Sequence, residues 1–469
     1  MKVRILSVFV FLFFALTIFG CGNSDTKGKP DLVLWHWMTD REEAFLELAK
    51  RYEEETGIKV SFELYAPSDA YSQKVRASAQ TGTLPDIYGL LAEKRDYAAF
   101  IKAGHITDLS DYMNGFIATN KDDYAKLIKK GFISDLTYDM EQKFKEWRRI
   151  FFKKALEVNI FPEGNQWGVK PGIYGVPIDV TNIQMLYNKD LFKEAGLDPE
   201  KPPKTWEEFI EAGRTLKAAG IPGLVSGWGE IWMIDCFASN YAMNIMGKDK
   251  VVATIKGKVP YTDPDWLKVF HLFKEMADEG ILAPGIVAMV NKSAEQTFAN
   301  NRAAFSFNGS WCVNVYRGMN PDLNYAAIPP PLVNKKNPMY IWGGAGASFL
   351  INEKSKAKEE AISFLKWLTY EPQQAFLSSK TNNLPANQKC LVDIPPILAQ
   401  FADDMEITTH PSILPASEYS QVIEFFNKGI QSIIIGEKTP EEVAAKVQEV
   451  KERRMEWTKK REARKKQNN

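Results

Sequence analysis

The sequence is poor in cysteine and histidine, with four of each among 469 residues. The histidines stand at positions 36, 105, 271 and 410, and the cysteines other than Cys21 stand at 236, 312 and 390. Neither set has the short spacing of a metal cluster. Three cysteines cannot all be paired, so we interpret them as small buried hydrophobic residues. The sequence therefore predicts neither a bound metal nor a cofactor.

An excess of charge of one sign is also missing, because Lys plus Arg and Asp plus Glu number 59 each. A nucleic-acid binder would need a basic excess, so no nucleic-acid partner is expected. The chain is 45% hydrophobic and 12% aromatic, which is enough apolar material at this length for two ordinary cores. Two lobes are the expected organisation.

A second apolar run long enough to span a membrane is lacking. The one long apolar run, from Ile5 to Phe19, follows Lys2 and Arg4, which predicts a secretory signal peptide over residues 1–20. The residues before Cys21 resemble a bacterial lipobox, which implies an acylated Cys21 and a lipidated N-terminus and linker over 21–30. We expect an extracytoplasmic protein anchored by lipid to the bacterial cell membrane; full release is the alternative.

Hydrophobic periodicity predicts alternating strands and helices near the start of the chain. Residues 31–37 and 59–64 are predicted strands, and Thr39 with Glu42 predicts a capping box for the helix between them. A helix over about 71–80 and a strand over 87–91 are expected next, and this order with short connections indicates parallel α/β units. Thr205 with Glu208 predicts a second capping box further along.

The stretch from Gly172 to Leu197 contains an interrupted apolar run. Val176–Ile178 and Met185–Tyr187 predict two strands, with the polar segment 179–182 as a break between them. Polar groups inside a buried run need hydrogen-bond partners, which the local fold or a ligand must supply. The pattern predicts a hinge, and an ordinary strand-end turn is the alternative.

The string YGVPIDVTNIQMLYNKDLFKEAGLDPEKPPKTWEEF, residues 174–209, resembles the crossover segment of the solute-binding proteins of ABC importers. More narrowly, it is similar to the sugar-binding family that includes maltose-binding protein. The strings FNGSWCVNV at 307–315 and PMYIWGGAGASFLINEKS at 338–355 resemble further elements of that family. The resemblance implies an α/β, two-lobed, type II periplasmic-binding-protein-like fold. Each lobe would have a mainly parallel sheet flanked by helices, with a hinge of crossing strands.

The resemblance also implies the lobe boundaries. The N-terminal lobe would comprise residues 31–178 plus 347–383, and the C-terminal lobe residues 179–346 plus 384–469. The three crossings would lie near Asp179, Gly344 and Leu384.

Aromatic and polar residues near these crossings are the candidate ligand contacts. Aromatic rings can cover the apolar faces of a sugar, while carboxylates and amides bind its hydroxyls. In the segment 225–237, alternation would place Trp228, Glu230 and Trp232 on one side of an extended strand. The resemblance implies that Asn308 and Trp311 share a turn that presents the indole. The full candidate set is Trp37, Asp40, Glu93, Asp179, Asn182, Trp228, Glu230, Trp232, Asn308, Trp311, Trp342, Gly343 and Asn387.

These features together predict a monomeric binding protein, not an enzyme. It would capture a carbohydrate, expected to be an oligosaccharide, between its lobes and deliver it to the permease subunits of an ABC transporter. One alternative is a secreted glycoside-active enzyme, because Asp40, Glu93, Asp179 and Glu230 could supply a carboxylate pair. A binder of a non-sugar solute, such as an anion, is the other, although the candidate loops are poor in Arg.

Two segments remain with open roles. The charged and aromatic segment 110–167 is either a surface decoration of the first lobe or a rim of the ligand site. The basic tail, Lys451 to Lys466, is either a solvated helix face or a region with loose attraction to anionic lipid.

Overall fold

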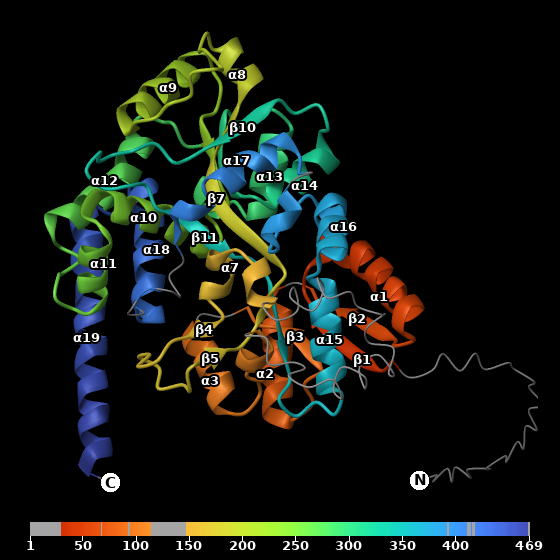
Figure 1. Cartoon of the computed structure of the whole chain (residues 1–469). Helices are drawn as coiled ribbons and strands as arrows, with labels where there is room; N and C mark the ends of the chain where they lie inside the picture. The colour runs from red at the N-terminus through yellow and green to blue at the C-terminus, as the bar shows by residue number, and fades with distance from the viewer. Residues whose placement is uncertain are drawn as a thin grey trace, which may run out of the picture.

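A computed structural model describes residues 30–467 except 67, 92–93, 114–146, 392–393, 410–413 and 415–417. Two sheets organise this part of the chain (Figure 1). The first has the strand order β2-β1-β3-β12-β6, and the second has the order β14-β11-β7-β9-β8 with β10 and β13 also paired to β7. The predicted signal peptide, Cys21, Glu93 and most of the 110–167 segment lie outside the described residues.

The first sheet and the helices near it come from the first stretch of the chain and from a later return. Their bounds are β1 (Leu32–His36), η1 (Thr39–Arg41), α1 (Glu42–Thr56), β2 (Val60–Leu64), α2 (Ser68–Thr81), β3 (Ile87–Gly89), α3 (Lys94–Lys102), α4 (Ser110–Met113), η2 (Trp147–Ile150), α7 (Lys153–Glu157), β4 (Ile160–Phe161), β5 (Gly172–Ile173), β6 (Val176–Pro177), β12 (Ser348–Ile351), α15 (Lys358–Leu368) and α16 (Glu371–Thr381).

The second sheet and its helices fill the remaining two stretches. Their bounds are β7 (Asp179–Asn188), α8 (Lys189–Glu194), α9 (Trp206–Ala218), β8 (Leu224–Val225), α10 (Ile231–Met246), α11 (Lys248–Ile255), α12 (Pro264–Asp278), η3 (Ile286–Ala288), α13 (Asn291–Ala299), β9 (Phe305–Gly309), α14 (Cys312–Met319), β10 (Tyr325–Ile328), β11 (Ile341–Ala345), β13 (Leu384–Pro385), η4 (Gln388–Leu391), α17 (Pro396–Asp403), η5 (Met405–Ile407), β14 (Thr408–Thr409), α18 (Ser420–Ile434) and α19 (Pro440–Gln467).

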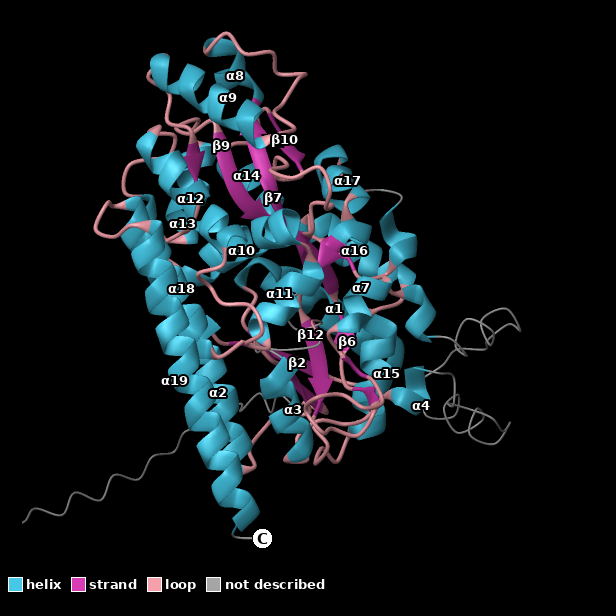
Figure 2. Cartoon of the chain, turned by 90° about the vertical axis from the view of Figure 1, so that its left-hand side faces the viewer, coloured by secondary structure: helices cyan, strands magenta, loops and turns pink. Residues whose placement is uncertain are grey.

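The expected two-lobed α/β fold is confirmed, but the sheets are mixed rather than mainly parallel. Strands β1, β2 and β3 pair in parallel, whereas β12 pairs antiparallel to β3 and β6. In the second sheet β7 pairs antiparallel with β9, β10, β11 and β13. In the first sheet the antiparallel strand is β12, which the chain adds when it returns, whereas β9, β10 and β11 run back along β7 within one passage through the second lobe. Figure 2 shows the strands of both sheets in magenta.

The chain changes from the first sheet to the second between β6 and β7, returns between β11 and β12, and changes again between α16 and β13. These changes support the lobe boundaries 31–178 plus 347–383 and 179–346 plus 384–469 as a proposed division.

Strand β7 is the central strand of the second sheet, and all ten of its residues are buried. The two predicted strands are present as β6 and β7, but the predicted position of the break at 179–182 is wrong, because those polar residues lie inside β7 itself. Strands β11 and β13 pair with this part of β7 from its two sides and so provide hydrogen-bond partners for its backbone. The chain changes sheet one residue earlier, at Ile178.

The two predicted capping boxes have opposite outcomes. The one at Thr205 is confirmed, with both reciprocal hydrogen bonds between Thr205 and Glu208 at the start of α9. The one at Thr39 is wrong, because Thr39 begins a short 3-10 turn and α1 starts only at Glu42 without a side-chain cap. The extra turn places Arg41 just before the helix, where it enters the contacts described below.

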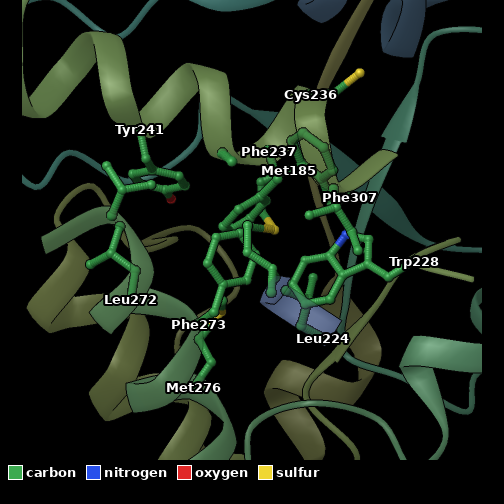
Figure 3. Packing of buried hydrophobic residues seen from close by; sticks show 14 of the residues in the cluster. Met185, Leu224, Trp228, Cys236, Phe237, Tyr241, Leu272, Phe273, Met276 and Phe307 are labelled. Carbon is green, nitrogen blue, oxygen red and sulfur yellow. The ribbon is translucent and has the colours of Figure 1, made fainter. Parts of the chain in front are cut away.

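Each lobe has its own apolar core. In the second lobe, Trp228 packs edge-to-face on Phe237, with the ring of Phe273 tilted beside both (Figure 3). In the first lobe, Phe45 stacks on Phe62 and lies beside Phe349 of the returning strand β12. The first lobe therefore depends on a segment that the chain supplies only after building most of the second.

Within the described ranges, no helix is apolar enough over a sufficient length to cross a membrane. The same residues contain no cluster of three or more His, Cys, Asp or Glu side chains arranged to hold a metal ion.

Candidate ligand-binding site

A buried ionic network centred on Arg41 ties the crossing segments together. Arg41 Nη2 donates to Asp179 Oδ2 at 2.5 Å, and Arg41 Nε lies 3.4 Å from Asp40 Oδ2. The backbone N–H of Ala347 donates to Asp179 Oδ1 at 2.5 Å, and Asn383 Nδ2 donates to Asp40 at 3.1 Å. Through the carboxylates of Asp40 and Asp179, Arg41 thus links η1, the start of β7, the chain before β12 and the chain before β13.

The electrostatics of this network favour the charged pair. Burial lowers the pKa of Arg41, but the neighbouring Asp179 and Asp40 raise it by more, so the net pKa lies above its usual range. Arg41 is 7% exposed and Asp179 is 4% exposed. Arg41 therefore keeps its charge although it is shielded from water, and its ion pair with Asp179 connects the crossing segments.

Three of the predicted ligand contacts, Asp179, Asn182 and Asn387, are buried and hydrogen-bonded within the protein. Asp179 is engaged by Arg41 and Ala347, as described above. Asn182 is fully buried, and its side chain donates to the carbonyl of Phe401 and accepts from Gln184. Asn387 is 1% exposed, and its amide is bonded within its own loop and to the carbonyl of Thr369. Their hydrogen-bonding groups connect segments of the fold, and they stay proposed ligand contacts.

Two indoles and two carboxylates form a cluster in the second lobe. The rings of Trp232 and Trp311 lie 6.1 Å apart at 47°. Trp232 Nε1 donates to Glu230 at 3.0 Å, and Trp311 Nε1 lies 3.3 Å from Glu295 Oε1. Trp232 is 41% exposed, which is unusual for so large an apolar side chain. We call these four residues the indole–carboxylate cluster.

Helix α13 positions both carboxylates of the cluster. The backbone N–H of Asn291, the first residue of α13, donates to Glu230, and its side chain donates to Glu295. Desolvation raises the pKa of Glu295 above its usual value, although hydrogen bonds from Asn308 and Trp311 work the other way. Asn308 is 1% exposed and its amide donates to Glu295, so it supports the cluster from below the surface and stays a proposed contact.

The position of Trp311 follows from small residues before it. A side-chain Cβ at Gly309 would lie 2.0 Å from the Trp311 ring, so only glycine leaves room for the indole to fold over the end of β9. Ser310 accepts or donates a hydrogen bond with Thr181 at 3.1 Å, and its N–H donates to the carbonyl of Asn182. Trp311 therefore lies beside the first residues of β7, where the chain passes between the lobes.

Trp37 is a partly exposed indole on the first lobe. Its ring lies against Tyr71 with a centroid distance of 5.2 Å. A Cβ at Gly89 would lie 2.2 Å from this ring, so glycine at the end of β3 makes room for it. Trp37 remains a proposed contact, as does Asp40, whose side chain is 34% exposed.

The other three predicted contacts, Trp228, Gly343 and Trp342, are buried or partly buried in the second lobe. Trp228 is fully buried and is wrong as a surface contact, because α10 starts at Ile231 and the expected extended alternation does not form. Gly343 is buried, and a Cβ there would lie 2.6 Å from Asn182, so it permits close approach of β11 and β7. Trp342 is partly buried against the core of the second lobe and stays a proposed contact.

Sequence reasoning missed Arg41, Glu295 and Gly89. Arg41 follows the candidate Asp40 directly, so its position was a usable signal. Glu295 lies within an ordinary helical pattern, and only the fold brings it to Trp311. Gly89 ends a strand without a positive φ, so its backbone does not require glycine. The need for glycine comes from the ring of Trp37, which covers it.

A direct hydrogen bond also joins the two lobes away from the crossings. Arg95 on α3 donates to the hydroxyl of Ser420 on α18 at 2.9 Å. Both groups are exposed, so this contact adds little stability. It shows that α3 and α18 face each other.

Comparison with known proteins places the chain in a family. Residues 47–409 match the family described as bacterial extracellular solute-binding protein. A binding protein of Brucella abortus is 23% identical over 446 residues, covering 91% of this chain and 93% of its own. The sn-glycerol-3-phosphate-binding periplasmic protein UgpB of Escherichia coli is 25% identical over 211 residues, covering 45% of this chain and 48% of UgpB.

Solved structures share the fold. A protein studied for xylan utilization by Caldanaerobius polysaccharolyticus superposes with a TM-score of 0.70 at 18% identity, covering 89% of this chain and 99% of the other. A chitin oligosaccharide binding protein superposes with a TM-score of 0.68 at 22% identity, covering 90% and 98%. The family match spans most of the chain, and these two structures share its fold. The chain belongs to the family of bacterial extracellular solute-binding proteins.

Proposed function

We propose that this protein captures an oligosaccharide between its two lobes and delivers it to the permease subunits of an ABC transporter. The observation that carries the proposal is the indole–carboxylate cluster, Glu230, Trp232, Glu295 and Trp311, beside the strand that passes between the lobes. Indole faces cover the C–H faces of pyranose rings, and carboxylates accept hydrogen bonds from sugar hydroxyls. The two indoles, whose rings lie 6.1 Å apart, offer more apolar surface than a single pyranose ring would cover, and this favours an oligosaccharide.

The two lobes supply the proposed mechanism. A ligand that contacts Trp37 on one lobe and the cluster on the other would stabilise the closed form by its differential affinity for that form. Rotation would occur about the crossings that the Arg41 network ties together. Only a closed lobe pair would then present the surface that a transporter recognises.

The partial likeness to UgpB supports one rival, a phosphorylated solute. Both Glu230 and Glu295 belong to the cluster. Desolvation raises the pKa of Glu295, and the nearby carboxylate of Glu230 raises it further. A phosphate placed there would meet negative charge rather than an Arg fork. The cluster therefore favours a neutral sugar.

A thermal-shift panel tests the proposal directly. Xylo-, chito- and malto-oligosaccharides, raffinose, monosaccharides and glycerol 3-phosphate would each be added to the purified protein. A ligand that binds only the native state raises the melting temperature as its concentration exceeds Kd. We expect at least one oligosaccharide to do so and to be recovered intact, without new reducing ends. A shift with glycerol 3-phosphate alone, or cleavage of the sugar, would refute the proposal.

Replacing Trp311 by alanine is expected to weaken oligosaccharide binding by about 1 to 3 kcal/mol, because one apolar platform is lost. Isothermal titration with the ligand found in the panel would measure the change. Trp457→Ala is the matched control, since Trp457 is 53% exposed on α19 and outside the proposed site. Unchanged affinity in Trp311→Ala together with early melting would identify Trp311 as a packing residue only.

The proposed lipid anchor rests on Cys21, which lies outside the described residues. We expect Cys21→Ala to move the protein from the membrane fraction to the soluble extracytoplasmic fraction, because no acyl chain can be attached. Cell fractionation and N-terminal analysis measure this. A wild-type protein that is soluble and begins at another residue would contradict it.

A further inference from the structure

The last turns of α19 carry a basic face with one tryptophan at its centre. Residues 453, 454, 457, 460, 461 and 464 fall within about 120° of one another on a helix that turns about 100° per residue. Five of them are Lys or Arg, and the sixth is Trp457. The three glutamates of this region, at 452, 456 and 462, take positions off this face. We call these six residues the basic face of α19.

Trp457 is exposed although tryptophan is costly to leave in water. It is 53% exposed, and the guanidinium groups of Arg454 and Arg461 lie 5.5 and 5.4 Å from its ring. These cation–π contacts hold the indole among positive charges without covering it. An aromatic ring surrounded by cations is suited to the boundary between water and lipid, where indoles collect.

The body of the protein holds this face in a fixed direction. Lys451 is fully buried and forms an ion pair with Glu418, so the solvated part of the basic tail begins after Lys451. Met455 packs against Gly257, where a Cβ would lie 2.4 Å from its methyl carbon. Beyond these two contacts the C-terminal part of α19 continues past the N-terminal end of α18 in both views (Figure 1 and Figure 2).

We propose that the basic face of α19 binds the surface of a membrane that contains anionic phospholipid. The family is extracytoplasmic, so nucleic acid is not a partner that this face would meet. Charge complementarity supports the choice of lipid, because residues 451–467 contain nine basic and three acidic side chains. Two of the face's cations, Arg453 and Lys460, pair with Glu449 and Glu456, but these exposed pairs are weak and open readily.

The consequence is a second attachment that does not depend on the sugar site. Lipidation of Cys21 would hold the N-terminus at the membrane, and the basic face would add an electrostatic contact on the second lobe. Because α19 is fixed to the second lobe, contact through its basic face would also orient that lobe relative to the membrane. A transporter in the same membrane would then meet the lobes in a restricted set of orientations.

Vesicle co-sedimentation tests this inference without the lipid anchor. The protein used is residues 21–469 with Cys21→Ser, which contains every described residue and cannot be acylated. It would be mixed with vesicles of phosphatidylcholine alone or of phosphatidylcholine with phosphatidylglycerol. We expect at least about tenfold stronger binding to the anionic vesicles, lost near 1 M salt, where the screening length falls to about 3 Å.

Variants on the basic face sharpen the result. R461E/R464E should reduce binding to anionic vesicles by about tenfold or more. K335E/K336E is the matched control, because it changes the net charge equally at two exposed lysines on the loop between β10 and β11 and should leave binding unchanged. Unchanged melting curves and circular dichroism would show that each variant is folded.

The tryptophan supplies an independent readout. Brominated phospholipids quench nearby indoles, so part of the fluorescence should be quenched in the wild type and this part should be absent in Trp457→Phe. Equal binding to neutral and anionic vesicles, or equal losses in the two charge variants, would overturn the proposal. So would an absence of vesicle binding together with salt-sensitive binding to the purified transporter, which would assign the face to a protein partner.

Discussion

Replacing Trp228 by alanine is expected to lower the free energy of unfolding by about 3 to 5 kcal/mol, the usual cost of truncating a large aromatic residue in a core. Trp228 is fully buried and its ring contacts Phe237 and Phe273 (Figure 3). The truncation removes these contacts and leaves a cavity that the helices α10 and α12 fill only in part. Urea unfolding followed by circular dichroism measures the loss.

Trp228→Phe is the matched variant for this effect. It keeps an aromatic ring in place and removes an indole N–H that has no hydrogen-bond partner among the described residues. A smaller loss of about 1 to 2 kcal/mol is expected, because most of the packing remains. If Trp228→Ala unfolded at the same urea concentration as the wild type but bound its ligand weakly, the assignment of Trp228 to the core would be wrong.

Replacing Arg41 by methionine is expected to cost about 3 to 5 kcal/mol of stability, because it leaves Asp179 buried without its partner. The loss should be larger than for a surface pair. Lys428→Met removes an exposed pair with Glu424 at 2.6 Å and should cost less than about 1 kcal/mol. Urea unfolding midpoints of the two variants provide the comparison.

The double variant Arg41→Met, Asp179→Asn separates charge from packing. Asparagine can still accept the hydrogen bond from the N–H of Ala347, and no unpaired charge remains. The double variant should therefore be more stable than Arg41→Met alone. If the double variant were less stable by the sum of two independent losses, Arg41 and Asp179 would not act as a pair.

The local pattern of the sequence predicted the type of most elements where one periodicity was clear. The strand and helix order of the first lobe and the capping box at Thr205 needed only neighbours within a few residues. The position of Trp311 after a glycine was also visible locally, although the role of Gly309 was not. The ring covers the glycine itself, so the missing side chain provides space rather than a turn.

Local patterns failed where a contact joins distant parts of the chain. The segment from Trp228 to Trp232 alternates like a strand, yet the second half begins helix α10, because its apolar residues pack against α12 and α18. The polar residues at the start of β7 predict a break, yet pairing with β11 and β13 satisfies them inside a continuous strand.

The sequence by itself determined the family, the alternation of strands and helices, and the segments in which the crossings lie. Only the tertiary structure decided that Trp228 faces inward while Trp232 faces out, and that Glu295 meets Trp311. It also paired Arg41 with Asp179 across 138 residues. The physical reason is that periodicity records which face of an element is apolar, whereas the partner of a polar group depends on which distant elements pack beside it.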